Sequence, residues 1–150
     1  MEEEGEKEKN CIAVVLRFLE AENRRDWKAW AKELHEEVVY VEQTGGEHVA
    51  RAERYVAAMR EVYKSLPDWV FRVVEVSCSN GRVFVRFDGE GHFCGVYKGT
   101  AYKDVPIRLQ SACAFGFKEG LIVSVEETYD RSSFERQLAT VGIAAGLPEC

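Results

Sequence analysis

The sequence predicts an α+β domain in which three helices precede a meander of long antiparallel strands. Apolar residues recur at helical spacing through the first 66 residues, whereas residues 69–129 read as β-rich runs separated by short turns. Elements in this order favour helices packed against one sheet. We therefore expect a cone-shaped fold, with N-terminal helices packed on a strongly curved, mainly antiparallel sheet that encloses an apolar cavity.

The first half of the chain supplies the helices. The first helix is expected to run to about residue 22, on apolar residues at helical spacing: Ile12, Val15, Leu16 and Leu19. Asp26 is a suitable N-cap for a short second helix, and a short strand is expected at 38–42. The third helix is expected over about residues 50–66, because Pro67 would stop it.

The second half supplies the strands, which we expect at 69–77, 82–93, 105–117 and 121–129. Asn80-Gly81, between the first two strands, is a strong hairpin signal. Residues 95–104 are expected to form a loop, and a closing helix is expected over residues 132–138.

Length and composition indicate one soluble domain over residues 1–150, with a disordered leader at 1–9 and a loose tail at 143–150. The acidic start of the chain is unlike a secretory signal, and no apolar run approaches the ~20 residues of a membrane span. The five widely spaced cysteines fit free thiols in a reducing compartment. We therefore expect a cytoplasmic protein with no membrane partner.

Charge and motifs exclude several classes of function. A net charge of −6 argues against nucleic acid as a partner, because phosphates demand a basic face. The sequence has no CxxC pair, no close Cys/His cluster and no nucleotide-binding motif. We therefore expect neither a metal nor another cofactor.

Several short motifs follow one another in a specific order. They are Asn23-Arg24-Arg25-Asp26-Trp27, Val38-Val39-Tyr40, Pro67, Gly91-His92-Phe93-Cys94-Gly95, Tyr97-Lys98-Gly99, Phe115-Gly116-Phe117-Lys118-Glu119-Gly120-Leu121-Ile122, Tyr129-Asp130 and Gln137-Leu138. Over about residues 12–142, this arrangement resembles the SnoaL-like polyketide cyclase branch of the nuclear transport factor 2-like superfamily. The resemblance implies the α+β cone fold.

The resemblance also implies an activity. Cyclases of that branch close a ring by an intramolecular aldol step without metal or cofactor, and an Asp at the end of the last strand is their acid/base residue. Position matching places that role on Asp130. The implied function is a cofactor-independent acid/base enzyme that acts on a small hydrophobic carbonyl compound, by aldol-type cyclisation or by isomerisation through an enolate.

The alternative is a non-catalytic binding module that holds a hydrophobic ligand or a protein partner in the cone. Two departures from the family pattern motivate it. The chain has Val125-Glu126 where the family has a His-Trp pair, and Gly116 where the family often has a His or an Arg. A third reading is an epoxide hydrolase or a dehydratase of the same fold.

The residues themselves give Asp130 two interpretations. In a strand, Glu126 and Asp130 share one face; if that face lines the cavity, desolvation and like charge would raise at least one pKa and favour acid/base chemistry. An Asp immediately before a helix is also a preferred N-cap. Asp130 is the first catalytic candidate, and Glu126 is a candidate for binding substrate.

His92 is the second catalytic candidate, because an imidazole can exchange a proton near neutral pH. The alternative is a strand histidine that points to solvent beside Asp88 and Glu90. Arg108 and Gln110 lie on the third predicted strand and are candidate substrate ligands. For Arg108, the alternative is a cross-strand ion pair with Glu90.

Four further residues lie on elements that would wall the cone and are candidates for binding a planar hydrophobic ligand: Trp30, Tyr40, Tyr55 and Met59. For Trp30 and Met59, whose positions follow helical spacing, the alternative is that they pack in the core and contact no ligand. Tyr40 and Tyr55 suit a pocket better, because a buried phenol needs a hydrogen-bond partner. The expected partner of the whole site is a small hydrophobic molecule.

Both faces of the predicted sheet carry apolar residues. One face would cover the cavity, and the other could pair with a second subunit, as relatives of this fold commonly do. We therefore expect a homodimer.

Overall fold

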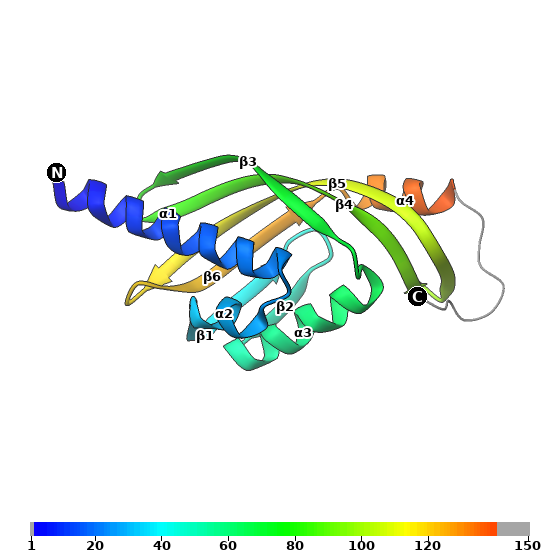
Figure 1. Ribbon diagram of the computed structural model, residues 1–150, viewed down its shortest axis with the longest axis horizontal. Helices are drawn as coiled ribbons and strands as arrows, with labels where there is room; N and C mark the ends of the chain where they lie inside the picture. Colours follow the sequence, from blue (N-terminus) through cyan, green and yellow to red (C-terminus); the bar gives the residue numbers. More distant parts are fainter. Residues whose placement is uncertain (1, 141–150) are drawn as a thin grey trace.

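The computed structural model describes residues 2–140, which form helices packed on one curved sheet (Figure 1). The helices are α1 (Glu2–Asn23), α2 (Trp27–Lys32), α3 (Ala52–Ser65) and α4 (Arg131–Ala139). The strands are β1 (Leu34–Glu42), β2 (Glu47–Ala50), β3 (Val70–Ser79), β4 (Arg82–Tyr97), β5 (Thr100–Lys118) and β6 (Leu121–Tyr129).

The sheet has the strand order β2-β1-β6-β5-β4-β3. Neighbouring strands run antiparallel except β1 and β6, which run parallel and bring the first strand beside the last. Helices α1, α2 and α3 lie along the concave side of the sheet (Figure 1). The expected α+β fold, with N-terminal helices on a curved and mainly antiparallel sheet, is confirmed.

Two tight turns shape the long hairpins. The turn between β3 and β4 has positive φ angles at Asn80 (52°) and Gly81 (74°), in line with the hairpin predicted there. A second turn has positive φ at Lys98 (48°) and Gly99 (81°), so that β4 and β5 pair as far as Tyr97 and Thr100. Residues 95–104 therefore continue the hairpin and do not form the expected loop.

The N-terminal part also differs from expectation. Helix α1 begins at Glu2, where the sequence predicted a disordered leader over residues 1–9. Strand β1 begins at Leu34, four residues before the predicted start, and β2 was not predicted. Its short, half-polar sequence at 47–50 gave no clear strand pattern, and its pairing with β1 defines it. The predicted loose tail at 143–150 lies outside the described residues.

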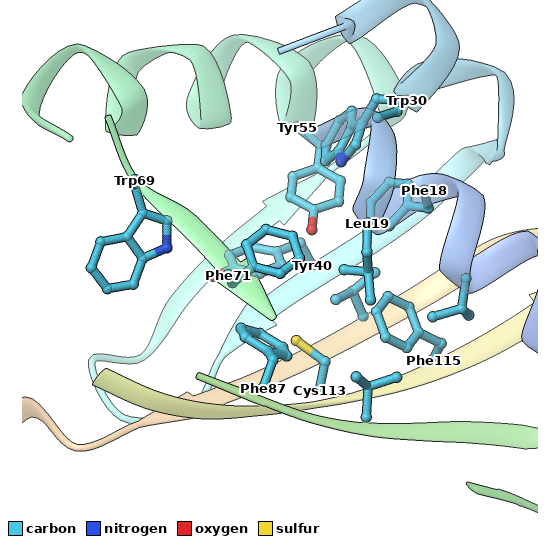
Figure 2. Close-up of a cluster of buried hydrophobic side chains, with 14 of the residues drawn as sticks. Phe18, Leu19, Trp30, Tyr40, Tyr55, Trp69, Phe71, Phe87, Cys113 and Phe115 are labelled. Atoms are coloured by element: carbon cyan, nitrogen blue, oxygen red, sulfur yellow. The ribbon is translucent and has the colours of Figure 1, made fainter. Parts of the chain in front are cut away.

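The core fills the space between the helices and the concave face of the sheet. Phe18 stacks on Trp30 with ring centroids 4.6 Å apart, and Phe115 of β5 meets Phe18 edge-on at 6.0 Å. Figure 2 shows this cluster continuing through Tyr40 and Tyr55 toward other aromatic rings. No helix within residues 2–140 is long and apolar enough to cross a membrane.

The inward-facing residues alternate along the strands. On β4 and β5, Val85 and Cys113 face the core, and on β6 Val125 does. Glu127 follows Val125 by two residues and therefore projects to the same concave side. This register places an acidic side chain where an apolar one would be usual.

Candidate active site inside the curved sheet

Glu127 of β6 carries a carboxyl group on the concave side of the sheet. The Tyr40 hydroxyl of β1 donates a hydrogen bond to Glu127 Oε1 at 3.0 Å. The Cys113 thiol of β5 donates to Glu127 Oε2 at 3.5 Å. Two neighbouring strands thus fix both oxygens of this carboxyl group.

Glu22 brings a second carboxyl group to the interior from the last turn of α1. The Tyr63 hydroxyl of α3 donates to Glu22 Oε2 at 2.5 Å, and the Trp30 indole N–H of α2 donates to Oε1 at 3.1 Å. This carboxyl group therefore links all three N-terminal helices.

Both carboxyl groups have raised pKa values. Burial raises the pKa of Glu22 to about 7, and the charge of Glu127 adds to this, while hydrogen bonds from Tyr63 and Trp30 oppose it. Burial likewise raises the pKa of Glu127, against hydrogen bonds from Tyr40 and Cys113. Glu22 can therefore gain or lose a proton near neutral pH, and the pKa of Glu127 is shifted in the same direction.

The surroundings of these groups explain the shifts. Protein atoms enclose both carboxyl groups, yet each residue keeps part of its surface accessible and is half-buried rather than buried. The atoms around each carboxyl group desolvate it, and this raises its pKa although part of the residue stays accessible.

Tyr55 of α3 is the third phenol of this interior. Only 3% of its surface is exposed, and its ring stacks on Tyr40 at 4.8 Å and meets Trp30 edge-on at 4.7 Å. In Figure 2 its hydroxyl points away from α3 into the aromatic cluster. Within residues 2–140, no hydrogen-bond partner of this hydroxyl is found.

Aromatic rings surround the polar groups. Phe71 of β3 and Phe87 of β4 pack 5.2 Å apart at one end of the cluster, and Trp69 lies beyond them (Figure 2). Met59 of α3 is half-buried and packs against the same core. Acidic and phenolic groups in an apolar enclosure suit proton transfer to or from a hydrophobic molecule.

Asp130 and Glu126 lie elsewhere. Asp130 is exposed, and its Oδ1 accepts a hydrogen bond from the Ser133 backbone N–H at 2.9 Å, which makes it the N-cap of α4. Glu126 pairs with Arg82 at 3.3 Å on the convex side of the sheet. Successive strand side chains alternate, so Glu127 facing inward turns Glu126 outward.

His92, Arg108 and Gln110 are also separate from the interior carboxyl groups. His92 Nδ1 lies 2.6 Å from Asp68 Oδ2, and both side chains are about half exposed. Arg108 pairs with Glu90 at 3.3 Å. Arg108 and Gln110 line a shallow groove of about 500 Å³ on the convex side. Of the predicted site residues, the structure brings together Trp30, Tyr40, Tyr55 and Met59 in the core.

Sequence reasoning missed four residues of the interior: Glu22, Tyr63, Cys113 and Glu127. A signal for Glu22 was present, because it continues the helical stripe of Ile12, Val15 and Leu19. An acidic residue on an apolar stripe is a candidate for a buried carboxyl group. Glu127 lies two residues after the apolar Val125 and so shares its face of the strand, which also marks a candidate for a buried carboxyl group. Only the structure shows which face of the strand is buried.

The cysteines differ in state. Cys11, Cys78 and Cys113 are free thiols, whereas Cys94 is disulfide-bonded. The expectation of free thiols therefore does not hold for Cys94, and wide sequence spacing could not reveal this. In the part of the chain that the structure describes, no group of three or more acidic, His or Cys side chains is placed to hold a metal ion.

Comparison with known proteins identifies the family. The model of the SnoaL-like polyketide cyclases matches residues 13–138. The chain belongs to this family. No curated protein sequence matches it.

Solved structures share the fold of this SnoaL-like protein. A candidate SnoaL-like polyketide cyclase from Jannaschia sp. CCS1 is 14% identical with a TM-score of 0.81, covering 90% of this chain and 95% of its own. AclR, a candidate hydroxylase from Streptomyces galilaeus, is 18% identical with a TM-score of 0.74, and the match covers 88% of this chain and 97% of AclR. An LEH-like epoxide hydrolase from M. tuberculosis is 14% identical with a TM-score of 0.72, and the match covers 89% of this chain and 92% of the hydrolase. At these identities the likeness concerns the fold alone.

Proposed function

We propose that this protein is a cofactor-independent acid/base enzyme that acts on a small hydrophobic carbonyl compound through an enolate. The observation that carries the proposal is the enclosed carboxyl group of Glu127, held by Tyr40 and Cys113 and raised in pKa by burial. A raised carboxyl pKa makes the carboxylate a stronger base, and the enclosure supplies the apolar contacts that such a substrate needs.

The proposed reaction begins with proton transfer. The Glu127 carboxylate takes a proton from the carbon next to the substrate carbonyl, and the electron pair of that C–H bond moves onto the carbonyl oxygen. In the cyclisation, the enolate attacks a second carbonyl of the same molecule, and Glu127 returns its proton to the alkoxide oxygen that forms. In the isomerisation, Glu127 returns that proton to another carbon of the enolate. Either route regenerates the carboxylate.

Asp130 and His92 remain candidate bases that variants can test. Asp130 is exposed and caps α4, and His92 pairs with Asp68 at a half-exposed position. Neither has the enclosure that would shield an enolate from water. We therefore assign the proton transfer to Glu127.

Deuterium exchange tests this assignment without knowledge of the natural substrate. The protein is incubated in D2O with a panel of aromatic 1,3-diketones and aryl ketones, and deuterium at the carbon next to the carbonyl is followed by mass spectrometry. We expect exchange above the buffer rate that falls at least ~100-fold in Glu127→Gln and stays within about threefold of wild type in Asp130→Asn and His92→Gln. If Asp130→Asn lost the exchange while Glu127→Gln kept the wild-type rate, Asp130 would be the base.

A second candidate function is a binding module without chemistry. The observation that favours it is the density of rings around the two carboxyl groups, which would hold a planar ligand without any proton transfer. It predicts saturable binding of an aromatic ketone with no deuterium exchange in wild type. Measured exchange would exclude it.

We also propose that the protein is a homodimer that pairs through the convex side of the sheet. That side exposes Phe84 of β4 beside the Arg82–Glu126 and Arg86–Glu75 ion pairs. In a two-fold dimer, the same patch of each subunit packs against its copy, so Phe84 of one subunit could contact the patch around Phe84 of the other. Light scattering at micromolar concentration should give twice the chain mass of 17.1 kDa, and a monomer would refute the dimer.

A further inference from the structure

We infer that the Tyr55 hydroxyl is the hydrogen-bond donor that binds the substrate oxygen, and that the ligand is therefore a neutral molecule with an accepting oxygen of the ketone type. The inference rests on the proposed function in using the same interior site. It adds the residue that recognises the substrate and the charge that the substrate must have.

The three interior phenols differ in their partners. The Tyr40 hydroxyl donates to Glu127 and the Tyr63 hydroxyl donates to Glu22. The Tyr55 hydroxyl donates to no group within residues 2–140, although Tyr55 is 3% exposed. It is also not among the fully covered, unpartnered side-chain atoms of the described residues, which are Asp88 Oδ1 and Arg131 Nε. The oxygen therefore borders accessible space.

An interior donor without a protein partner is uncommon, because most interior polar groups in native proteins are hydrogen-bonded. The ring has little freedom to search for a partner, because Tyr40 stacks on one side and Trp30 meets it edge-on. A fixed donor that borders accessible space is suited to a ligand that brings the acceptor.

The charges around Tyr55 define that acceptor. Burial raises the pKa of the Tyr55 phenol well above its usual range, and the charges of Glu22 and Glu127 add to this. The phenol therefore stays protonated and keeps an O–H group that can donate a hydrogen bond. The same two carboxyl groups would repel an anionic ligand, so a carbonyl oxygen fits and a carboxylate does not.

The position of Tyr55 also suits the reaction. Its ring stacks on Tyr40, and Tyr40 donates to Glu127, so these contacts connect the donor with the base. A carbonyl that accepts from Tyr55 gains negative charge on its oxygen as Glu127 removes the neighbouring proton. The hydrogen bond would strengthen as that charge develops and would stabilise the enolate.

The test uses 2-acetylnaphthalene with a 13C label in the carbonyl carbon. A donated hydrogen bond withdraws electrons from the carbonyl and moves its 13C signal downfield. We expect a saturable downfield shift with wild type and with Tyr97→Phe, a phenol that pairs with Glu135 outside the interior. In Tyr55→Phe we expect the shift to vanish and the affinity to fall about 3–10-fold, the value of one neutral hydrogen bond.

Three controls keep the outcomes distinct. The analogue 2-ethylnaphthalene, which has no oxygen, should bind wild type and Tyr55→Phe equally, and 2-naphthoate should bind wild type more weakly than the ketone. The same carbonyl shift in Tyr55→Phe, or no ketone binding to wild type, would overturn the inference. If the shift depends on Tyr55 while no variant alters deuterium exchange, Tyr55 recognition stands and the proton-transfer proposal fails.

Discussion

The Tyr40 hydroxyl donates a hydrogen bond of 3.0 Å to Glu127 Oε1 across the parallel junction of β1 and β6. This junction joins the first strand of the chain to the last, so residues 87 positions apart share one polar contact. The contact places a carboxyl group and a phenol against the rings of the N-terminal helices. Those neighbours desolvate the carboxyl group and raise its pKa.

Removing the Tyr40 hydroxyl should act on Glu127. The hydrogen bond stabilises the charged carboxylate, so Tyr40→Phe should raise the pKa of Glu127 further. It should also lower the free energy of unfolding by about 1–2 kcal/mol in urea titrations near neutral pH. Tyr55→Phe is the matched control and should cost little, because its hydroxyl has no partner within residues 2–140. Equal losses in the two variants would contradict this account.

Stability should fall as pH rises because of Glu22. Its pKa is raised from 4.5 to about 7, so between these values the folded protein binds more protons than the unfolded chain. The stabilisation is fully present below about pH 4.5 and lost as pH rises through about 7, and amounts to roughly 3 kcal/mol at most. Urea unfolding from pH 5 to pH 8 measures the slope.

The variant for this measurement is Glu22→Gln, which should reduce the slope. Part of the slope should remain, because Glu127 is raised in pKa and contributes with the same sign. Glu36→Gln, at an exposed position of β1, should leave the slope unchanged. A Glu22→Gln profile that superimposes on wild type would show that Glu22 titrates normally in the folded protein.

Asp130 should matter for stability through its cap. Asp130→Ala removes the acceptor for the Ser133 N–H and should cost about 1 kcal/mol, whereas Asp130→Asn keeps a capping oxygen and should cost much less. Asp26→Ala removes the corresponding capping oxygen of α2 and should destabilise the fold by a similar amount. Thermal unfolding of the three variants provides the comparison, and an Asn variant as unstable as the Ala variant would argue against the cap.

Gly89 of β4 should be intolerant of a side chain. A Cβ at this position would collide with the indole ring of Trp69, so Gly89→Ala should displace Trp69 and cost about 1–3 kcal/mol in urea unfolding. Gly5→Ala in α1 is the control, because nothing lies within 4 Å of its Cβ position and Ala favours a helix. Equal stability of the two variants would mean that Trp69 moves aside freely.

The sequence predicted the fold because its signals were local. The stripe of Val15 and Leu19 marked α1, Pro67 marked the end of α3, and Asn80-Gly81 marked a hairpin that the structure contains. The long hairpin of β4 and β5 was read as broken by a loop. Lys98 takes a positive φ that the prediction did not consider, and this lets a two-residue turn close the hairpin.

The candidate site was harder to predict because it depends on which face of β6 is concave. If the register of β6 shifts by one residue, Glu127 faces the concave side in place of Glu126 and Asp130. The pairings of β1 with β6 and of β5 with β6 each contain a register irregularity. Tyr40 and Tyr55 were expected to line a pocket, and both are buried. The hydrogen bond of Tyr40 to Glu127 joins distant elements, so the sequence could not reveal it.

The most direct measurement is a carboxyl-carbon NMR titration of Glu127, with Glu127→Gln used to assign its signal. The account predicts a pKa clearly above the ~4.3 of a free Glu side chain, which should rise further in Tyr40→Phe. A pKa at or below that reference, unchanged in Tyr40→Phe, would mean that solvent reaches the carboxyl group freely. Glu127 would then lack the desolvation on which its proposed role as acid and base depends.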